Sequence, residues 1–319
     1  MDALVLIEHD GGEADDGSLQ AVTLARAYAD GAVHAVLVGA GAAQAAAGGL
    51  GGVATAFVAT LEADAFAPDA WACAVCELIG RLSPAVVLAA GSDRGNDVMA
   101  RVAARLDLPL AANCTAADPT ESGAAVMRVR WGGSLLEEAA LVGSPVLATT
   151  ALHAVAAAPR EGSASVEHFA PALEAGDLAV LVTEHVDAAG GGVSLTDADV
   201  VVSGGRGVGS TEAFAVVEEL AQLLGGAVGC SRAVTMAGWR PHSDQVGQTG
   251  TKIAPELYIA CGISGATQHM AGCKGAKHLL AINADAEAPI FASADYAVIG
   301  DLHEVLPAVS EAIRKARQP

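Results

Sequence analysis

The feature that most constrains this chain is a repeated pairing, in its last third, of a short apolar run with a polar, glycine-rich turn. Val200–Val202 leads into Gly204-Gly-Arg-Gly207, Leu257–Cys261 leads into Gly262-Ile-Ser-Gly265, and a third run ends at Asn283. Short continuous apolar runs are typical of strands buried on both faces of a parallel sheet. Because parallel strands end at the same edge of a sheet, the pattern predicts that these turns meet there.

The first half of the chain also alternates apolar runs with helical patterns. Residues 1–110 contain about four such β-α units, which predicts a doubly wound, mostly parallel sheet of the nucleotide-hydrolase or flavodoxin-like kind. Ser18 is expected to cap the first helix and Asp97 to begin the fourth. Three further strands, at the edge of the sheet or in an antiparallel extension of it, are expected over 126–131, 145–151 and 179–186.

The length of 319 residues and a glycine-rich stretch around Gly190-Gly-Gly192 indicate two domains. We expect an N-terminal α/β domain over 1–187, a linker over 188–199, and a second, Rossmann-like parallel-sheet domain over 200–319. Residues 232–254 of the second domain show no clear helix or strand pattern. A loop of that length in a compact domain usually has a function.

The charge of the chain is strongly acidic and unevenly distributed. Residues 1–199 contain eight Arg, no Lys and 26 acidic residues, whereas residues 200–319 contain nine basic and 11 acidic residues. The absence of a basic face argues against nucleic-acid binding. The nearly neutral second domain suits a bound anionic dinucleotide.

Targeting and cysteine patterns favour a reducing bacterial cytoplasm. The N-terminus lacks the basic start of a signal peptide, and no apolar run reaches the roughly 20 residues that a membrane span requires. The six cysteines form no disulfide framework. Cys73-Ala-Val-Cys76 lies in a helical pattern among apolar residues, so it is read as core rather than as a metal or redox site.

The turn after Val202 invites a dinucleotide-binding interpretation that fails in detail. Gly205 and Gly207 fit the pattern GxGxxG, but Ser210 stands at the third glycine position, and no acidic residue follows the next strand. A tight strand-to-helix turn remains an alternative. Arg206 favours a ligand, because a guanidinium suits phosphate or carbonyl oxygens.

Two other segments offer groups that could hold a large cofactor. Gln245-Val-Gly-Gln-Thr-Gly250 supplies amides, a hydroxyl and backbone N–H groups that match the edge of a flat heterocycle. Ser264-Gly-Ala266, at an expected helix start, could cradle a pyrophosphate. His269 follows one turn later, and a lone histidine is more often a structural hydrogen-bonding residue than a catalyst. The sequence shows no nucleophile–base arrangement and no metal-ligand spacing, so we expect no catalytic residues and no metal.

Several motifs in fixed order resemble the FAD-binding domain of the α subunit of electron transfer flavoproteins. They are Gly204-Gly-Arg-Gly207, Ser231-Arg232, Gln245-Val-Gly-Gln-Thr-Gly250, Leu257-Tyr-Ile-Ala260, Gly262-Ile-Ser-Gly-Ala-Thr-Gln-His269, Ala281-Ile-Asn283, Glu287-Ala-Pro-Ile-Phe291, Ala294-Asp-Tyr296 and Gly300-Asp-Leu302. The N-terminal half resembles the family more loosely, through Arg94-Gly-x-Asp97, Arg101-Val-Ala-Ala-Arg105-Leu and Gly132-Gly133. Ala284 departs from the Lys often found there, which puts one phosphate or ribose contact in doubt.

The resemblance implies a C-terminal domain of the DHS-like NAD/FAD-binding kind that holds one FAD. Arg206, Ser264, Gly265 and Ala266 would serve the phosphates, and Asn283, Asp285 and Asp301 the ribose and adenine. Arg232, Gln248, Thr249 and a proton-donating His269 would surround the isoalloxazine, where Arg232 and His269 can stabilise negative charge on a reduced flavin. The full set of expected cofactor-binding residues is Arg206, Ser231, Arg232, Gln245, Val246, Gly247, Gln248, Thr249, Gly250, Ser264, Gly265, Ala266, Gln268, His269, Asn283, Asp285, Asp301 and Leu302.

The resemblance also implies partners and a role. A β subunit would pack against both domains to form a heterodimer. The pair would shuttle electrons from flavin dehydrogenases, such as the acyl-CoA type of fatty acid β-oxidation, to a quinone reductase or another acceptor. The chain would thus be an electron carrier rather than an enzyme, since the cofactor carries the chemistry.

Two other classes of function remain open on the residues alone. An NAD(P)-dependent dehydrogenase or transhydrogenase subunit would need an acid–base pair and a ribose-binding acid, although Arg232 could favour a 2′-phosphate. A nucleotide-binding regulatory module with no redox role is the third possibility.

Overall fold

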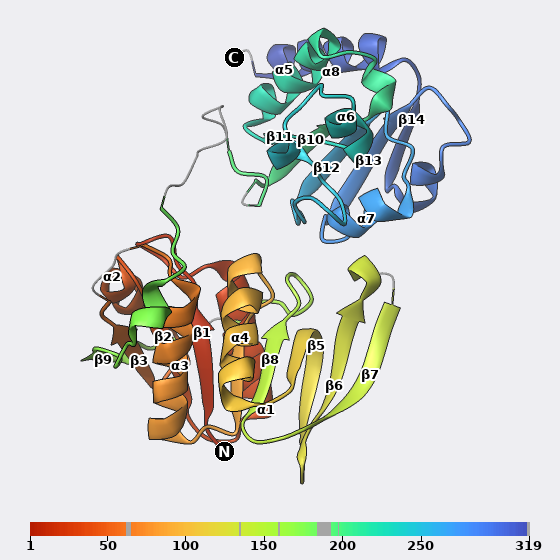
Figure 1. Ribbon diagram of the computed structural model, residues 1–319. Helices are drawn as coiled ribbons and strands as arrows, with labels where there is room; N and C mark the ends of the chain where they lie inside the picture. The colour runs from red at the N-terminus through yellow and green to blue at the C-terminus, as the bar shows by residue number, and fades with distance from the viewer. Residues whose placement is uncertain (62–64, 134, 159, 184–192, 197, 318–319) are drawn as a thin grey trace. The chain divides into compact units, whose positions relative to one another are not determined.

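The computed structural model describes residues 1–317 except 62–64, 134, 159, 184–192 and 197. The chain divides into two compact units, Met1–His185 and Val186–Pro319, and each unit is built around its own sheet (Figure 1). The predicted α/β class with two parallel-rich sheets is therefore confirmed. Half of the expected linker, at 188–192 and 197, lies outside the described residues.

The first unit contains a nine-stranded sheet in the order β7-β6-β5-β8-β4-β1-β2-β3-β9. Pairs β5–β6 and β6–β7 are antiparallel, and the other pairs are parallel. The strands are β1 (Ala3–Ile7), β2 (Val33–Val38), β3 (Thr55–Ala59), β4 (Val86–Ala90), β5 (Leu110–Thr120), β6 (Gly123–Arg130), β7 (Leu135–Val142), β8 (Val146–Thr150) and β9 (Ser165–Phe169). The expected antiparallel extension exists as β5 to β7, but β8, expected in it, is a central parallel strand.

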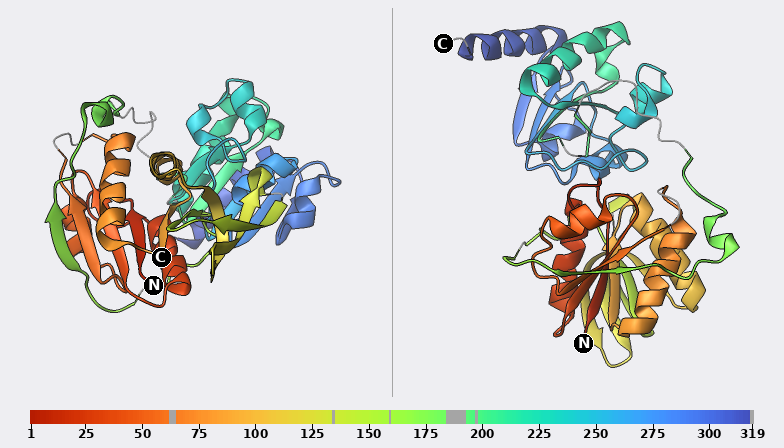
Figure 2. Two further views of the ribbon diagram at one scale, coloured as in Figure 1. Left: turned by 60° about the horizontal axis from the view of Figure 1, so that its bottom comes forward. Right: turned by 90° about the vertical axis from the view of Figure 1, so that its left-hand side faces the viewer.

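Four helices cover both faces of this sheet: α1 (Asp16–Tyr28), α2 (Ala42–Ala47), α3 (Pro68–Leu82) and α4 (Asp93–Leu106). The apolar side chains of α1 and α2 share one buried cluster with one face of the strands. Those of α3 and α4 share a second cluster with the opposite face. The two layers flank the sheet in Figures 1 and 2. The central parallel strands β1, β4 and β8 are fully buried because both of their faces are covered, as their continuous apolar runs predicted.

Two predicted helix starts were wrong for the same reason. Helix α1 begins at Asp16, and Ser18 lies buried inside it, where its hydroxyl accepts a hydrogen bond from the Glu8 backbone N–H at 2.8 Å. Helix α4 begins at Asp93, because Ser92 caps it by accepting a hydrogen bond from the Gly95 N–H at 2.8 Å. A hydroxyl can cap a helix or bond to a neighbouring strand end, and only tertiary contacts decide which.

The strand predicted over 179–186 was wrong for the described residues 179–183, which form no strand. A short 3₁₀ helix, Ala175–Leu178, precedes them and is held by a capping box between Glu174 and Asp177. The edge of the sheet beside β3 is occupied by β9 instead. Without a strand to pair with, an apolar run has no reason to stay extended.

The second unit has five parallel strands in the order β11-β10-β12-β13-β14. They are β10 (Val200–Gly204), β11 (Ala227–Cys230), β12 (Leu257–Cys261), β13 (His278–Asn283) and β14 (Tyr296–Ile299). Helices α5 (Ala215–Leu224) and α8 (Leu302–Ala316) lie side by side over one face (Figure 2). Helix α7 (Thr267–Cys273) contributes to the buried cluster on the other face.

The segment 232–254, expected to be irregular, is partly helical. Helix α6 (Arg232–Met236) begins directly after β11, and a 3₁₀ turn covers His242–Asp244. The remainder is tied back to the sheet, since the Val246 N–H donates to the Cys230 carbonyl oxygen at 2.8 Å. This segment therefore has a defined position at the carboxyl edge of the strands.

Candidate functional site

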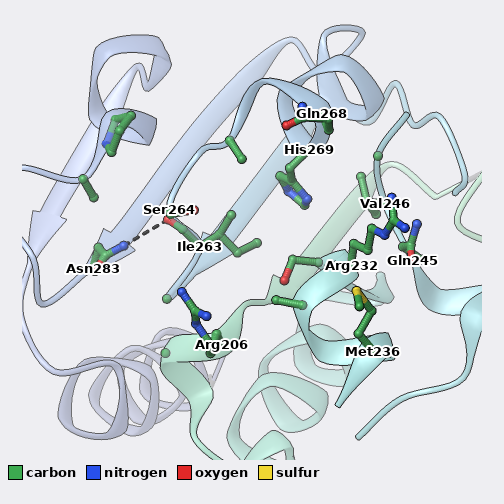
Figure 3. Close-up of a pocket in the computed structure, with 18 of the residues that line it drawn as sticks. Arg206, Arg232, Met236, Gln245, Val246, Ile263, Ser264, Gln268, His269 and Asn283 are labelled. Carbon is green, nitrogen blue, oxygen red and sulfur yellow. Dashed lines mark hydrogen bonds between the residues drawn. The ribbon is translucent and has the colours of Figure 1, made fainter. Parts of the chain in front are cut away.

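A cavity of about 670 Å³ opens at the carboxyl ends of the strands of the second unit. Its walls come from the turns after β10, β11, β12 and β13 and from the segment 245–249 (Figure 3). From β10 the chain runs to β11 on one side and then crosses back to β12 on the other side of β10, which makes this a topological switch point of the sheet. Ligands of open α/β sheets bind at such points, and the volume is that of a site for a sizeable small molecule.

Glycines allow the turns after β10 and β12 to touch. A Cβ on Gly205 would lie 2.2 Å from the Gly262 carbonyl oxygen, and one on Gly207 would lie 2.8 Å from the Gly262 Cα. Gly262 itself has a φ of 63°, a conformation that disfavours other residues. The close approach holds Arg206 and Ser264 on adjacent turns at the mouth of the cavity.

Most of the residues predicted from the sequence line this one cavity. They are Arg206, Ser231, Arg232, Gln245, Val246, Gly247, Gln248, Thr249, Ser264, Ala266, Gln268, His269, Asn283 and Asp285. Arg206 and Asn283 lie toward one end, and Arg232 and Gln245 lie toward the other (Figure 3). The site is therefore elongated, with polar groups at both ends.

Four predicted residues lie outside the lining, and each has a structural role. A Cβ on Gly250 would lie 2.1 Å from the Gln245 carbonyl oxygen, and one on Gly265 would lie 2.5 Å from the Ile290 backbone. Asp301 caps α8, with its Oδ1 accepting from the His303 N–H at 2.9 Å. Leu302 is buried in the core.

Seven lining residues were not predicted as site residues: Gly207, Ala233, Met236, Gly262, Ile263, Ala288 and Pro289. Five of them fall inside the sequence motifs quoted above, so attention to apolar and backbone contacts would have found them. Ala233 and Met236 stand one turn or less after Arg232 on α6. Nothing in the sequence marks Met236, whose side chain is largely exposed at the rim.

The two arginines of the site differ from Arg240 and Arg314 of the same unit. Arg240 and Arg314 each form an ion pair with a glutamate, namely Glu218 and Glu219. In contrast, neither Arg206 nor Arg232 has an ion-pair partner among the residues that the structure describes. Unpaired guanidinium groups beside a cavity favour an anionic or carbonyl-rich ligand.

His269 lies in the wall of the cavity but is tied into the protein. Its Nε2 lies 2.7 Å from the hydroxyl of Tyr258, a residue fully buried on β12. Burial lowers the pKa of His269 to about 4, and the backbone of Val246 opposes that effect. The ring is therefore neutral near pH 7 before a ligand binds. It can donate a hydrogen bond, but the positive charge that a proton-donating histidine would supply is absent until something in the cavity raises its pKa.

Asn283 fixes the turn after β12. Its Nδ2 donates to the Ile263 carbonyl oxygen at 3.0 Å, and its Oδ1 accepts from the Asp285 N–H at 3.0 Å. One amide thus orders both the turn after β12 and the start of the turn after β13. The Asp285 carboxylate also accepts from the Glu287 N–H at 3.0 Å, so this turn is ordered before any ligand is present.

The equivalent edge of the first sheet is closed by its own side chains. Glu8 follows β1, is 5% exposed, and its Oε1 accepts from the Ser92 hydroxyl, which follows β4. Burial raises the pKa of Glu8, and the Ser92 hydrogen bond opposes this shift. A carboxyl group in this position disfavours the binding of a phosphate group at this edge.

The comparisons with known proteins cover both units. Residues 3–174 match the model of the electron transfer flavoprotein domain, and residues 194–274 match the model of the electron transfer flavoprotein FAD-binding domain. The chain belongs to the electron transfer flavoprotein family. Within that family it is an α subunit, and the cofactor of its second domain is FAD.

Curated relatives support the family assignment over the full length. The electron transfer flavoprotein subunit alpha of Mycobacterium leprae is 41% identical over 99% of this chain and 99% of its own. The protein of the same name from Mycobacterium tuberculosis is 40% identical over 99% of both chains. That of Thermoanaerobacterium thermosaccharolyticum is 38% identical over 79% of this chain and 78% of its own.

The residues of the cavity fit FAD, judged by their chemistry. The elongated shape suits a dinucleotide, and the unpaired Arg206 and Arg232 can balance its negative charge and polar ring oxygens. Within the described ranges, no three His, Cys, Asp or Glu side chains form a metal site, and no helix is long and apolar enough to cross a membrane.

Proposed function

We propose that this chain is the FAD-holding subunit of a heterodimeric electron carrier. It would accept electrons from flavin dehydrogenases, such as those that oxidise acyl-CoA substrates, and deliver them to a quinone reductase or another acceptor. The single observation that carries this proposal is the cavity, which collects cofactor-holding groups from four strand ends around two unpaired arginines. FAD supplies the electron-accepting ring system, and the protein supplies position and electrostatics.

The ends of the cavity suggest which residues hold which part of the cofactor. Arg206, Ser264 and Ala266, on the touching turns after β10 and β12, would bind the pyrophosphate. Asn283 and Asp285 lie toward the same end (Asn283 in Figure 3) and would bind the ribose and adenine. Gly265 shapes this turn, since its φ is 85° and a side chain would collide with Ile290.

The other end would hold the isoalloxazine. Arg232, Gln248, Thr249 and His269, all in the cavity lining, would surround it, together with Val246 and Gly247. Arg232 is the group best placed to favour electron uptake, because its charge is permanent while the ring of His269 is neutral. These residues bind and orient the ring and stabilise the charge that it gains on reduction.

An enzyme with its own substrate turnover is less well supported. A nicotinamide-dependent dehydrogenase needs an acid–base group free to meet its substrate. In the described part of the cavity, the only histidine is buried and bonded to Tyr258, and the one carboxylate, Asp285, is engaged with its own turn. We therefore propose an electron carrier without a reaction of its own.

A β subunit is the proposed permanent partner, packing against a first domain over 1–187 and against the second over 200–319, with 188–199 as linker. Large apolar side chains are exposed on the antiparallel extension of the first unit, among them Trp131, Leu136 and Val142. Patches of this kind on a small protein usually mark an interface. All six cysteines are free, which agrees with the proposed bacterial cytoplasm.

Expression with and without the β subunit tests this proposal. We expect a yellow complex that releases FAD on denaturation, and a chain that aggregates or loses FAD when produced alone. Reduction by a flavin dehydrogenase and reoxidation by a quinone acceptor should require the complex. A colourless protein that binds NADP, or a complex that turns over a substrate without a second enzyme, would refute the proposal.

A further inference from the structure

Gln245 is the most buried polar side chain of the cavity wall, at 2% exposure. It lies at the start of the segment after α6 and joins the sheet by a bridge to Cys230 at the end of β11. The sequence suggested that its amide would meet the edge of a flat heterocycle. The structure instead shows the amide engaged at both ends within the protein.

The carbonyl end of the amide faces α6. Gln245 Oε1 accepts from the Thr235 hydroxyl at 2.7 Å, which is shorter than the 3.0 Å that separates this hydroxyl from the Arg232 carbonyl oxygen. A hydroxyl has one proton to donate. Its donation to Gln245 fixes the amide with its oxygen toward α6 and its nitrogen toward the segment that follows.

The nitrogen end of the amide faces Thr249. Gln245 Nε2 donates to the Thr249 Oγ1 at 3.0 Å. The Thr249 hydroxyl oxygen thus accepts one hydrogen bond from the amide, which leaves the proton of this hydroxyl free to be donated to another group. Thr249 is exposed and lines the cavity, so that group can be a ligand in the cavity. The relay therefore runs from the Thr235 hydroxyl through the Gln245 amide to the Thr249 hydroxyl.

We infer that Gln245 is a positioning residue that makes the Thr249 hydroxyl a hydrogen-bond donor into the flavin end of the cavity. The same amide ties α6, which carries Arg232, to the segment that carries Thr249, so that both groups keep one relative position. This inference rests on the proposed assignment of this end to the isoalloxazine. An apolar residue in place of Gln245 would leave the shape of the cavity unchanged but would allow the Thr249 hydroxyl to rotate.

A donor aimed at the ring should favour the reduced cofactor, because a reduced flavin carries more negative charge on its nitrogen and oxygen atoms. Thr249→Val removes the donor, and we expect a lower midpoint potential in the FAD-loaded heterodimer. Gln245→Met, which keeps the length of the side chain, should shift the potential in the same direction and by less. Thr235→Val should give the smallest shift, because it frees the amide to turn without removing it.

A double-mutant cycle decides the role of Gln245. If Gln245 acts through Thr249, Gln245→Met should shift the potential in the wild-type background and leave it unchanged in the Thr249→Val background. The same loss of effect is expected for Thr235→Val, a milder change that serves if Gln245→Met does not fold. The potentials are measured by reductive titration, with the FAD content and the thermal unfolding midpoint of each variant as controls.

Two results would overturn the inference. Equal shifts from Gln245→Met in both backgrounds would show that Gln245 contacts the cofactor directly, and no shift in either would show that the relay is only structural. Failure of the proposed function is a separate outcome, since the wild-type heterodimer would then contain no FAD to titrate.

Discussion

The two units of this protein share a sheet architecture but differ at its carboxyl edge. Each sheet reverses its strand order beside its first strand, β1 in one and β10 in the other, and so creates a crevice of the kind that binds nucleotides. In the first unit, Glu8 and Ser92 meet across the crevice and close it. In the second, glycines hold the turns together below the edge and leave a cavity of about 670 Å³ above them.

The comparison shows that topology provides a crevice and that a few side chains decide its use. A buried carboxyl repels phosphate, whereas unpaired arginines attract it. The overall charge follows the same division, with the acidic excess almost entirely in residues 1–199. The predictions below test these differences, from the largest expected effect to the smallest.

Separating the touching turns of the second unit should abolish its site. A side chain on Gly205 would collide with the Gly262 backbone, so Gly205→Val should eliminate FAD binding and destabilise this unit by more than about 3 kcal/mol. Gly209→Ala is the control: it has open space around it and a φ of 94°, so it should cost only about 1 kcal/mol of strain. FAD content and denaturant unfolding measure both effects. Retained FAD in Gly205→Val would contradict the role assigned to the contact.

Acid should weaken the second unit through His269. Burial lowers the pKa of this histidine from 6.5 to about 4, so the unfolded chain binds a proton that the folded chain excludes. Its contribution to stability is therefore full above pH 6.5 and is lost as the pH falls toward 4, by on the order of 3 kcal/mol. His269→Gln should flatten this part of the curve of unfolding free energy against pH. An unchanged slope between pH 4 and 6.5 would show that the ring is not neutral when folded.

Substitution of Arg206 and of Arg232 should separate the effect on FAD binding from the effect on the midpoint potential of the flavin. Arg206→Ala removes a guanidinium from the phosphate end and should weaken FAD binding by about 10- to 100-fold, with the potential nearly unchanged. Arg232→Ala should lower the midpoint potential while FAD binding largely survives, because this charge acts on the ring. Equilibrium dialysis and reductive titration of the same two variants provide the test. Identical behaviour of the two would refute the division of the cavity into ends.

The closed crevice should respond to removal of its carboxyl with a small gain in stability. Burial raises the pKa of Glu8, so its stabilising contribution is present at low pH and is lost as the pH rises through the raised value. Glu8→Gln keeps the acceptor for Ser92 and should stabilise the protein at pH 8 by less than about 1 kcal/mol, with little effect at pH 4 and none on FAD content. Destabilisation at pH 8 would show that the charged form is favoured.

The fold could be predicted from sequence wherever one signal dominated. The central strands β8, β10 and β12 were found within about two residues, because runs such as 257–261 are apolar throughout and are buried on both faces. The edge strands β7 and β9 were missed, since their sequences, LLEEAALV and SVEHF, do not alternate regularly between apolar and polar residues. Ser18 was misread as a cap because its actual partner, the Glu8 backbone, is ten residues away.

Much of the candidate site was also predicted, for a related reason. The turns at the strand ends contain Arg206, Gln245–Thr249 and Ser264. Such polar, glycine-rich turns are not needed to build a hydrophobic core, so their composition indicated a binding site. Gly250, Gly265 and Asp301 belong to the same turns but support the backbone rather than line the cavity. The amino-acid composition of a turn indicates that the turn has a function. It does not distinguish a residue that contacts a ligand from a residue that stabilises the backbone of the turn.

The sequence by itself determined the α/β class, the parallel central strands, the family and the turns that line the cavity, because these follow from local periodicity and from motifs in fixed order. Tertiary structure alone decided that one crevice is open and the other closed, that His269 is neutral beside Tyr258, and that the Gln245 amide points inward. These properties depend on distances between groups far apart in the chain. Desolvation and hydrogen bonding exist only once those groups have been brought together.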